Sequence, residues 1–156
     1  MSMNILVMSD THGNPNLALK ACQSANADTI IHLGDGGDDA DLLSHVMGVC
    51  VIAVAGNCDR GYEAPRERLW ECAGKRILLT HGDAYGVKGG MGRLEQRGRE
   101  LGVDAVLYGH THIPAIHELS GILFVNPGTL VSTSHATCAM LEISDAGISA
   151  RIFDIP

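Results

Sequence analysis

Short apolar runs recur along the chain, and a turn or a polar segment follows each of them. In the first part, these runs alternate with stretches whose apolar residues recur at helical spacing. Strands are predicted over residues 4–8, 29–33 and 49–55. Helices are predicted from Asn14-Pro15 onward and over about residues 38–46. The strand–helix–strand–helix–strand order predicts parallel pairing with right-handed crossovers.

The second part of the chain changes character. Residues 68–72 and 76–80 flank the turn sequence Ala73-Gly74-Lys75, which predicts a β-hairpin. A helix is expected over about residues 91–101. A strand over 105–108 follows, and then four short strands that we expect to be antiparallel, 115–119, 122–126, 138–143 and 148–153. No linker or repeat interrupts the pattern, so residues 1–156 are expected to form a single α/β domain.

Five polar clusters each come directly after one of these apolar runs. They are Asp10-x-His12, Gly34-Asp35, Gly56-Asn57, His81-Gly82 and Gly109-His110-x-His112. The carboxyl ends of strands line one crevice in α/β sheets, so the five clusters are expected to converge although they span about a hundred residues.

The residue types in these clusters suit metal binding. The two aspartates and the asparagine offer oxygen, and the four histidines offer imidazole nitrogen. Seven side chains exceed the need of one tetrahedral site and suffice for two metals that share a carboxylate. The mixture favours Mn, Fe, Co, Ni or Zn over Ca or Mg. Two such cations can clamp a phosphoryl group and acidify bound water.

One such motif alone is weak evidence, because a histidine at a strand end is often only a hydrogen-bonding partner. The ordered set of five, together with Gly56-Asn57-Cys58-Asp59, resembles the signature of the calcineurin-like metallophosphoesterase superfamily. The resemblance runs from about residue 3 to residue 130, and Asn126-Pro127-Gly128 also resembles a loop of the family. Within the superfamily, the chain resembles the small single-domain bacterial and archaeal phosphodiesterases.

This resemblance implies a two-sheet α/β/β/α sandwich with mixed parallel and antiparallel strands, no cap domain and a dinuclear metal site. It implies that the first metal binds Asp10, His12, Asp35 and His112, and that the second binds Asp35, Asn57, His81 and His110. Asp35 would bridge the two. With Asn57 and His81, it would activate a bridging hydroxide that attacks phosphorus in line. The expected cofactors are two divalent ions, with Mn as first choice and Ni, Co, Fe or Zn as alternatives.

The chain departs from the family pattern at Cys58, where many members carry a histidine that assists the leaving group. A thiol with an ordinary pKa of about 8.5 is a weaker electrostatic partner than an imidazolium. Asp59 would normally orient that histidine, so its role is open. Arg60 follows directly and could meet a substrate phosphate or belong to a solvated face. These three residues are additional candidates for a catalytic role.

Other residues near the motifs receive simpler interpretations. His32 lies inside a predicted strand and is expected in the core or behind the site. His45 and His117 are expected on the surface, and His135 is a weak candidate for the site. Asp83, beside His81, is expected to support that histidine.

The formal net charge of −7 argues against a broad cationic surface for nucleic acid, but not against a phosphate ester held by metals. The longest apolar run has seven residues, and a membrane helix needs about 18 or more. Five cysteines without a C-x-x-C pair predict a cytoplasmic protein, with Cys22, Cys50 and Cys138 buried. The expected partner is a small phosphodiester substrate, nucleotide-derived ones included, and self-association stays open.

The sequence therefore predicts a metal-dependent phosphodiesterase. The main alternative is a non-catalytic protein-interaction scaffold of the same fold, like the retromer subunit, which ranks lower because all seven ligand positions are filled. A metal-dependent amidohydrolase would need a barrel of roughly 250 residues. A Cys58 nucleophile would need its own base, but the nearby histidines are better used as ligands.

Overall fold

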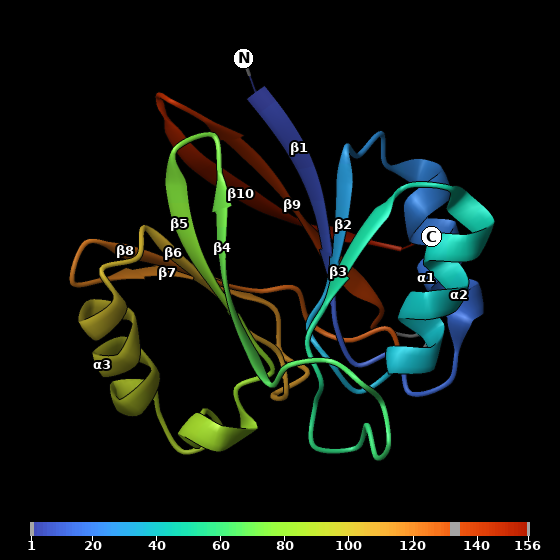
Figure 1. Cartoon of the computed structure of the whole chain (residues 1–156), viewed down its shortest axis with the longest axis horizontal. Coiled ribbons are helices and arrows are strands. Elements are labelled where there is room, and N and C mark those ends of the chain that lie inside the picture. Colours follow the sequence, from blue (N-terminus) through green and yellow to red (C-terminus); the bar gives the residue numbers. More distant parts are fainter. Residues whose placement is uncertain (1, 132–134, 156) are drawn as a thin grey trace.

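Two five-stranded sheets face each other in the computed structural model, which describes residues 2–131 and 135–155 (Figure 1). The first sheet has the order β10-β9-β1-β2-β3. Its strands are β1 (Ser2–Met8), β2 (Thr29–His32), β3 (Cys50–Ala53), β9 (Thr137–Ser144) and β10 (Gly147–Asp154). The parallel pairing of β1 with β2 and of β2 with β3 confirms the predicted unit.

Helices α1 (Pro15–Ser24) and α2 (Gly37–Met47) lie together on the outer face of the first sheet (Figure 1). Helix α1 begins at Pro15, whose fixed φ suits the first turn of a helix. Helix α2 carries Asp38 and Asp39 in its first turn, where negative charge is favoured by the helix dipole. Both crossover helices lie where the sequence pattern predicts them.

The second sheet has the order β4-β5-β6-β8-β7. Its strands are β4 (Glu67–Cys72), β5 (Lys75–Thr80), β6 (Ala105–Leu107), β7 (Ala115–Leu119) and β8 (Ile122–Asn126). A short 3-10 turn (Asp83–Tyr85) and helix α3 (Gly92–Leu101) join β5 to β6, and α3 covers the outer side of this sheet (Figure 1). The predicted hairpin is the β4–β5 pair.

One pairing differs from the expectation that the last four strands are antiparallel. β8 is antiparallel to β7 but parallel to β6, and it lies between the two. The burial of the two strands explains this order, because four of the five residues of β8 are buried whereas β7 has none that is fully buried. The more apolar strand takes the inner position, and β7 forms the edge.

Apolar side chains fill three layers. Ile5 and Val7 of the first sheet meet Ile77 and Leu79 of the second in the central core. The alternate residues of these strands point the other way, toward α1 and α2 on one side and toward α3 on the other. Burial of both faces explains why the strands read as unbroken apolar runs. The arrangement confirms the expected α/β/β/α sandwich.

Two sequence-based expectations about burial were wrong. Cys50 is exposed, because it is the first residue of the edge strand β3, whereas Cys22 and Cys138 are buried as expected. His117 is partly buried rather than on the surface, because its ring stacks on Phe124 with 5.7 Å between the ring centroids. Across the described residues, no helix is both long and apolar enough to cross a membrane.

Candidate metal centre

Four of the five polar clusters contact one another through their side chains at one end of the sandwich, and Gly56 of the fifth lies against Asp35. Five of the seven predicted ligands have a positive φ, namely Asp10, His12, Asp35, His110 and His112, with values between 48° and 71°. Side chains other than glycine rarely adopt this conformation, although Asp and His tolerate it better than most. Such strain persists only where surrounding contacts hold it, and it concentrates at functional sites.

Two of the glycines in the motifs are required by close approaches. A Cβ atom on Gly56 would lie 2.2 Å from Asp35 Oδ1, and one on Gly109 would lie 2.2 Å from Ser9 Oγ. Both distances are far below van der Waals contact. The absence of a side chain at these positions therefore lets the loops after β2 and β3, and those after β1 and β6, pack directly on one another.

Asp10 is fully buried and uses its two carboxylate oxygens differently. Oδ2 accepts hydrogen bonds from Ser9 Oγ at 2.6 Å and from the His110 backbone N–H at 3.2 Å. Oδ1 lies 3.2 Å from His112 Nε2 and 3.5 Å from His12 Nε2. One oxygen is thus fixed by the protein, and the other faces imidazoles.

Asp35 repeats this arrangement from the loop after β2. Its Oδ1 accepts a hydrogen bond from the Cys58 backbone N–H at 2.8 Å. Its Oδ2 lies 3.3 Å from His81 Nε2 and 3.7 Å from His12 Nε2. The two aspartates therefore present one oxygen each toward a shared group of histidines.

His81 is fully buried, and its hydrogen bonding fixes which ring nitrogen is free. Nδ1 lies 2.8 Å from the Leu33 carbonyl oxygen, so Nδ1 carries the proton and donates it. Nε2 is the ring nitrogen that faces the site, and it lies 3.2 Å from His110 Nδ1. Burial and the neighbouring His81 lower the pKa of His110. Two imidazole nitrogens close to each other and to carboxylates form an arrangement that a cation can satisfy.

Three groups of donor atoms can be drawn among the described residues, each with all its ligand atoms within 4.8 Å of one another. They are Asp10, His12 and His112; Asp35, His81 and His110; and His12, Asp35 and Cys58. Asp35 and His12 each occur in two of the groups, and Asp35 is the carboxylate of the two. The residues present therefore fit the divalent cations that the sequence implies, and the individual ligand assignments stay predictions.

Comparisons with known proteins agree with this geometry. Residues 3–146 match the calcineurin-like phosphoesterase superfamily domain. The chain belongs to this superfamily. A probable metallophosphoesterase of Methanothermobacter thermautotrophicus is 34% identical over 160 residues, covering 96% of this chain and 91% of that protein. Phosphodiesterase YfcE of Escherichia coli K12 is 28% identical over 153 residues, covering 82% of this chain and 79% of that protein.

A solved structure extends the comparison to the fold of this calcineurin-like phosphoesterase domain. Vacuolar Protein Sorting 29 from Cryptosporidium parvum superposes with a TM-score of 0.82 at 20% identity, covering 99% of this chain and 92% of that one. At this identity the match demonstrates a shared architecture.

Asn57 stands apart from the other predicted ligands of the phosphoesterase domain. Its side chain is exposed, and its Nδ2 lies 3.6 Å from Cys58 Sγ. No contact within the described part of the chain joins its Oδ1 to the carboxylates or imidazoles. Its assignment as a ligand stays a prediction.

Cys58 has the surroundings of a protonated thiol. Partial desolvation and the negative charge of Asp35 raise the pKa of Cys58. A nucleophilic cysteine needs a lowered pKa instead. The structure therefore gives no support to the cysteine-nucleophile alternative.

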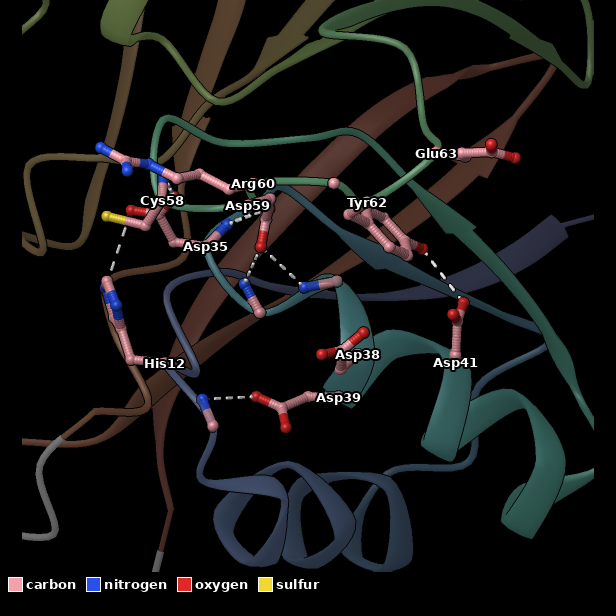
Figure 2. Close-up of a pocket in the computed structure, with 14 residues that line it drawn as sticks. His12, Asp35, Asp38, Asp39, Asp41, Cys58, Asp59, Arg60, Tyr62 and Glu63 are labelled. Atoms are coloured by element: carbon pink, nitrogen blue, oxygen red, sulfur yellow. Dashed lines mark hydrogen bonds and ion pairs between the residues drawn. The ribbon is translucent and has the colours of Figure 1, made fainter.

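A pocket of about 760 Å³ adjoins the donor groups (Figure 2). His12, Asp35 and Cys58 form its inner side, and the start of α2 and residues 59–63 form the rest. The outer wall is rich in carboxylates, which come from Asp38, Asp39, Asp41 and Glu63, with Arg60 as its basic residue. Asp39 also accepts the Gly13 backbone N–H at 2.9 Å, which fixes the loop that carries His12.

Three further sequence-based expectations can be compared with the structure. His32 lies directly behind the site, as expected: Gly34 N–H donates to its Nδ1 at 3.1 Å, and its Nε2 donates to Thr11 Oγ1 at 3.0 Å. His135 is exposed and belongs to none of the donor groups found among the described residues. Asp83 does not support His81, because it pairs with Arg66 at 2.6 Å while His81 donates to a backbone carbonyl.

Asn126 is a supporting residue whose role the sequence did not reveal. It is fully buried, and its Nδ2 donates to Gly109 O at 3.2 Å and to Thr111 Oγ1 at 2.9 Å. Its Oδ1 accepts the Gly128 N–H at 2.9 Å. The amide thereby ties the loop with His110 to the loop after β8. The resemblance of Asn126-Pro127-Gly128 to a family loop was the available signal.

Proposed function

We propose that this chain is a metal-dependent phosphodiesterase with a dinuclear centre, and that Mn²⁺ is its preferred metal. The observation that carries the proposal is the pair of buried carboxylates, each with one oxygen fixed by N–H or O–H donors and the other directed at shared imidazoles. Membership of the phosphoesterase superfamily supports the reaction class. The phosphodiesterase name of a relative supports the choice of diesters.

In this proposal one metal binds Asp10, His12, Asp35 and His112, and the other binds Asp35, Asn57, His81 and His110. When bound, the cations would withdraw charge from the phosphoryl oxygens and supply a hydroxide for in-line attack on phosphorus. The protein keeps His81 Nε2 available, because Nδ1 donates to the Leu33 carbonyl. It also orients Asp35 through the Cys58 backbone N–H.

The substrate is proposed to be a small phosphodiester with a good leaving group. Position 58 carries a thiol of raised pKa, which is a poor proton donor for a departing alkoxide. The carboxylates of Asp38, Asp41 and Glu63 on the pocket wall disfavour polyphosphates and long nucleic acids, which would bring further negative charge. Three expectations from the sequence stay predictions. They are that the substrates include small nucleotide-derived diesters, that the protein is cytoplasmic and that it can self-associate.

The scaffold alternative has one specific observation in its favour, the shared fold with Vacuolar Protein Sorting 29. The two functions differ in turnover, since a scaffold needs no metal-dependent hydrolysis of a phosphodiester. Hydrolysis of bis-p-nitrophenyl phosphate by protein treated with EDTA and reloaded with Mn²⁺, Ni²⁺, Co²⁺ or Zn²⁺ separates the two. We expect turnover that returns with metal and exceeds turnover of p-nitrophenyl phosphate. Absence of turnover with all four metals would favour the scaffold.

A further inference from the structure

Asp59 accepts four backbone hydrogen bonds, more than any other side chain in the described part of the site. Its Oδ2 accepts the N–H groups of Asp35 at 2.7 Å and Gly56 at 2.8 Å. Its Oδ1 accepts those of Gly36 at 2.8 Å and Gly37 at 2.9 Å. Both oxygens are therefore fully engaged by the main chain.

The four donors belong to segments that are separate in the sequence. Asp35 and Gly36 lie in the loop after β2, Gly37 is the first residue of α2, and Gly56 lies in the loop after β3. The first N–H groups of a helix have no partner within the helix, and a carboxylate satisfies them well. Asp59 thus joins two strand-end loops and a helix start through one ionised group.

These contacts fix Asp35 at both its main chain and its side chain. The backbone N–H of Asp35 donates to Asp59, and its Oδ1 accepts from the N–H of Cys58, the residue next to Asp59. Asp35 has a φ of 59°, a conformation that needs such support. Its remaining oxygen, Oδ2, faces His12 and His81.

We propose that Asp59 is a positioning residue that sets the orientation of Asp35 as the carboxylate shared by two metals. This inference rests on the proposed function for the metal pair. Asp59 does not orient a histidine, since position 58 is a cysteine, and it does not act as the general acid, since both its oxygens already accept N–H groups. Residues that orient metal ligands are worth about 10–100-fold in metal affinity.

The test compares Asp59→Asn with Asp28→Asn as a matched control. Asp28 also accepts a backbone N–H, that of Asn4 at 2.8 Å, but it precedes β2 at the opposite end of the strands. The amide nitrogen introduced by Asp59→Asn would face two backbone N–H donors, so two of the four hydrogen bonds would be lost. Mn²⁺ binding to EDTA-treated protein is measured by calorimetry, and urea unfolding reports stability.

We expect Asp59→Asn to raise the Mn²⁺ dissociation constant about 10–100-fold, whereas Asp28→Asn loses stability with affinity unchanged within about twofold. Asp59→Glu, which keeps both oxygens, should recover part of the affinity. Equal affinity in Asp59→Asn and the wild type would overturn the proposal. Equal losses of affinity in Asp59→Asn and Asp28→Asn would also overturn it, because they would indicate general destabilisation.

A measurement on the wild type keeps the proposal testable if Asp59→Asn does not fold. The amides of Gly36 and Gly37 should exchange with solvent slowly in the metal-free protein, and exchange as fast as that of the exposed Gly61 would refute the four-bond arrangement. Wild-type protein that binds Mn²⁺ but hydrolyses no diester would refute the proposed function alone. The effect of Asp59 on affinity would still be measurable in that case.

Discussion

His32 makes the stability of this protein depend on pH in a way that can be calculated. It is fully buried behind the metal centre, between Gly34 N–H and Thr11 Oγ1. Burial lowers its pKa from 6.5 to about 4, against the opposing effect of nearby carboxylates such as Asp59. The folded protein therefore keeps His32 neutral over a range in which the unfolded chain takes up a proton.

The direction and the size of the change in unfolding free energy follow from the linkage between protonation of His32 and folding. Because the folded pKa lies below the unfolded value, this contribution is fully present above about pH 6.5 and is lost as the pH falls toward 4. With these two pKa values, the loss between pH 7 and pH 5 is about 2 kcal/mol, since one pKa unit corresponds to about 1.4 kcal/mol.

His32→Asn removes the titrating group while keeping a polar atom near Gly34. Urea unfolding of wild type and variant, followed by the fluorescence of Trp70 in the presence of EDTA, gives the free energy of unfolding at each pH. Carboxylates common to both proteins cancel in the difference. We expect the advantage of the wild type to shrink by about 2 kcal/mol between pH 7 and pH 5. If the difference in unfolding free energy between the wild type and His32→Asn stays constant within about 0.5 kcal/mol from pH 7 to pH 5, the result would refute a buried, neutral His32.

Three further predictions concern the site itself. Asp35→Asn should abolish both metal content, measured by mass spectrometry, and diester hydrolysis, because its Oδ2 faces both His12 and His81; retained activity would refute the shared-ligand arrangement. Cys58→His should raise rates most for poor leaving groups, so an unchanged dependence of rate on leaving-group pKa would contradict the role given to position 58. Gly109→Ala should cost about 1–3 kcal/mol in urea unfolding, because the added Cβ would lie 2.2 Å from Ser9 Oγ; unaltered stability would show that the close approach is not rigid.

The elements could largely be predicted from the sequence because each depends on a local pattern. Strands at 4–8, 29–33 and 49–55 were expected, and Ser2–Met8, Thr29–His32 and Cys50–Ala53 are observed. The position of β8 between β6 and β7 was not predicted, since it depends on which strand the other elements bury more deeply. The exposure of Cys50 was missed for the same reason, because only the sheet order makes β3 an edge.

Supporting residues were harder to predict than the donors that they hold. Asn126 and Asp59 act largely through backbone N–H and C=O groups, which every residue carries, so the sequence marked the two positions without revealing their partners. The partner of Asp83 was misassigned because closeness to His81 in the sequence does not determine where the Asp83 side chain points. The carboxylate of Asp83 pairs with Arg66 instead.

The sequence by itself determined the chemical identity of the donors and their placement after strands, because residue type and periodicity are local properties. The tertiary structure decided which oxygen and which nitrogen faces the site. The contact of His110 N–H with Asp10 Oδ2 joins residues one hundred positions apart, and the free nitrogen of His81 depends on the carbonyl of Leu33. Orientation of this kind arises from packing between distant segments, so it exists only once both sheets and their loops are in place.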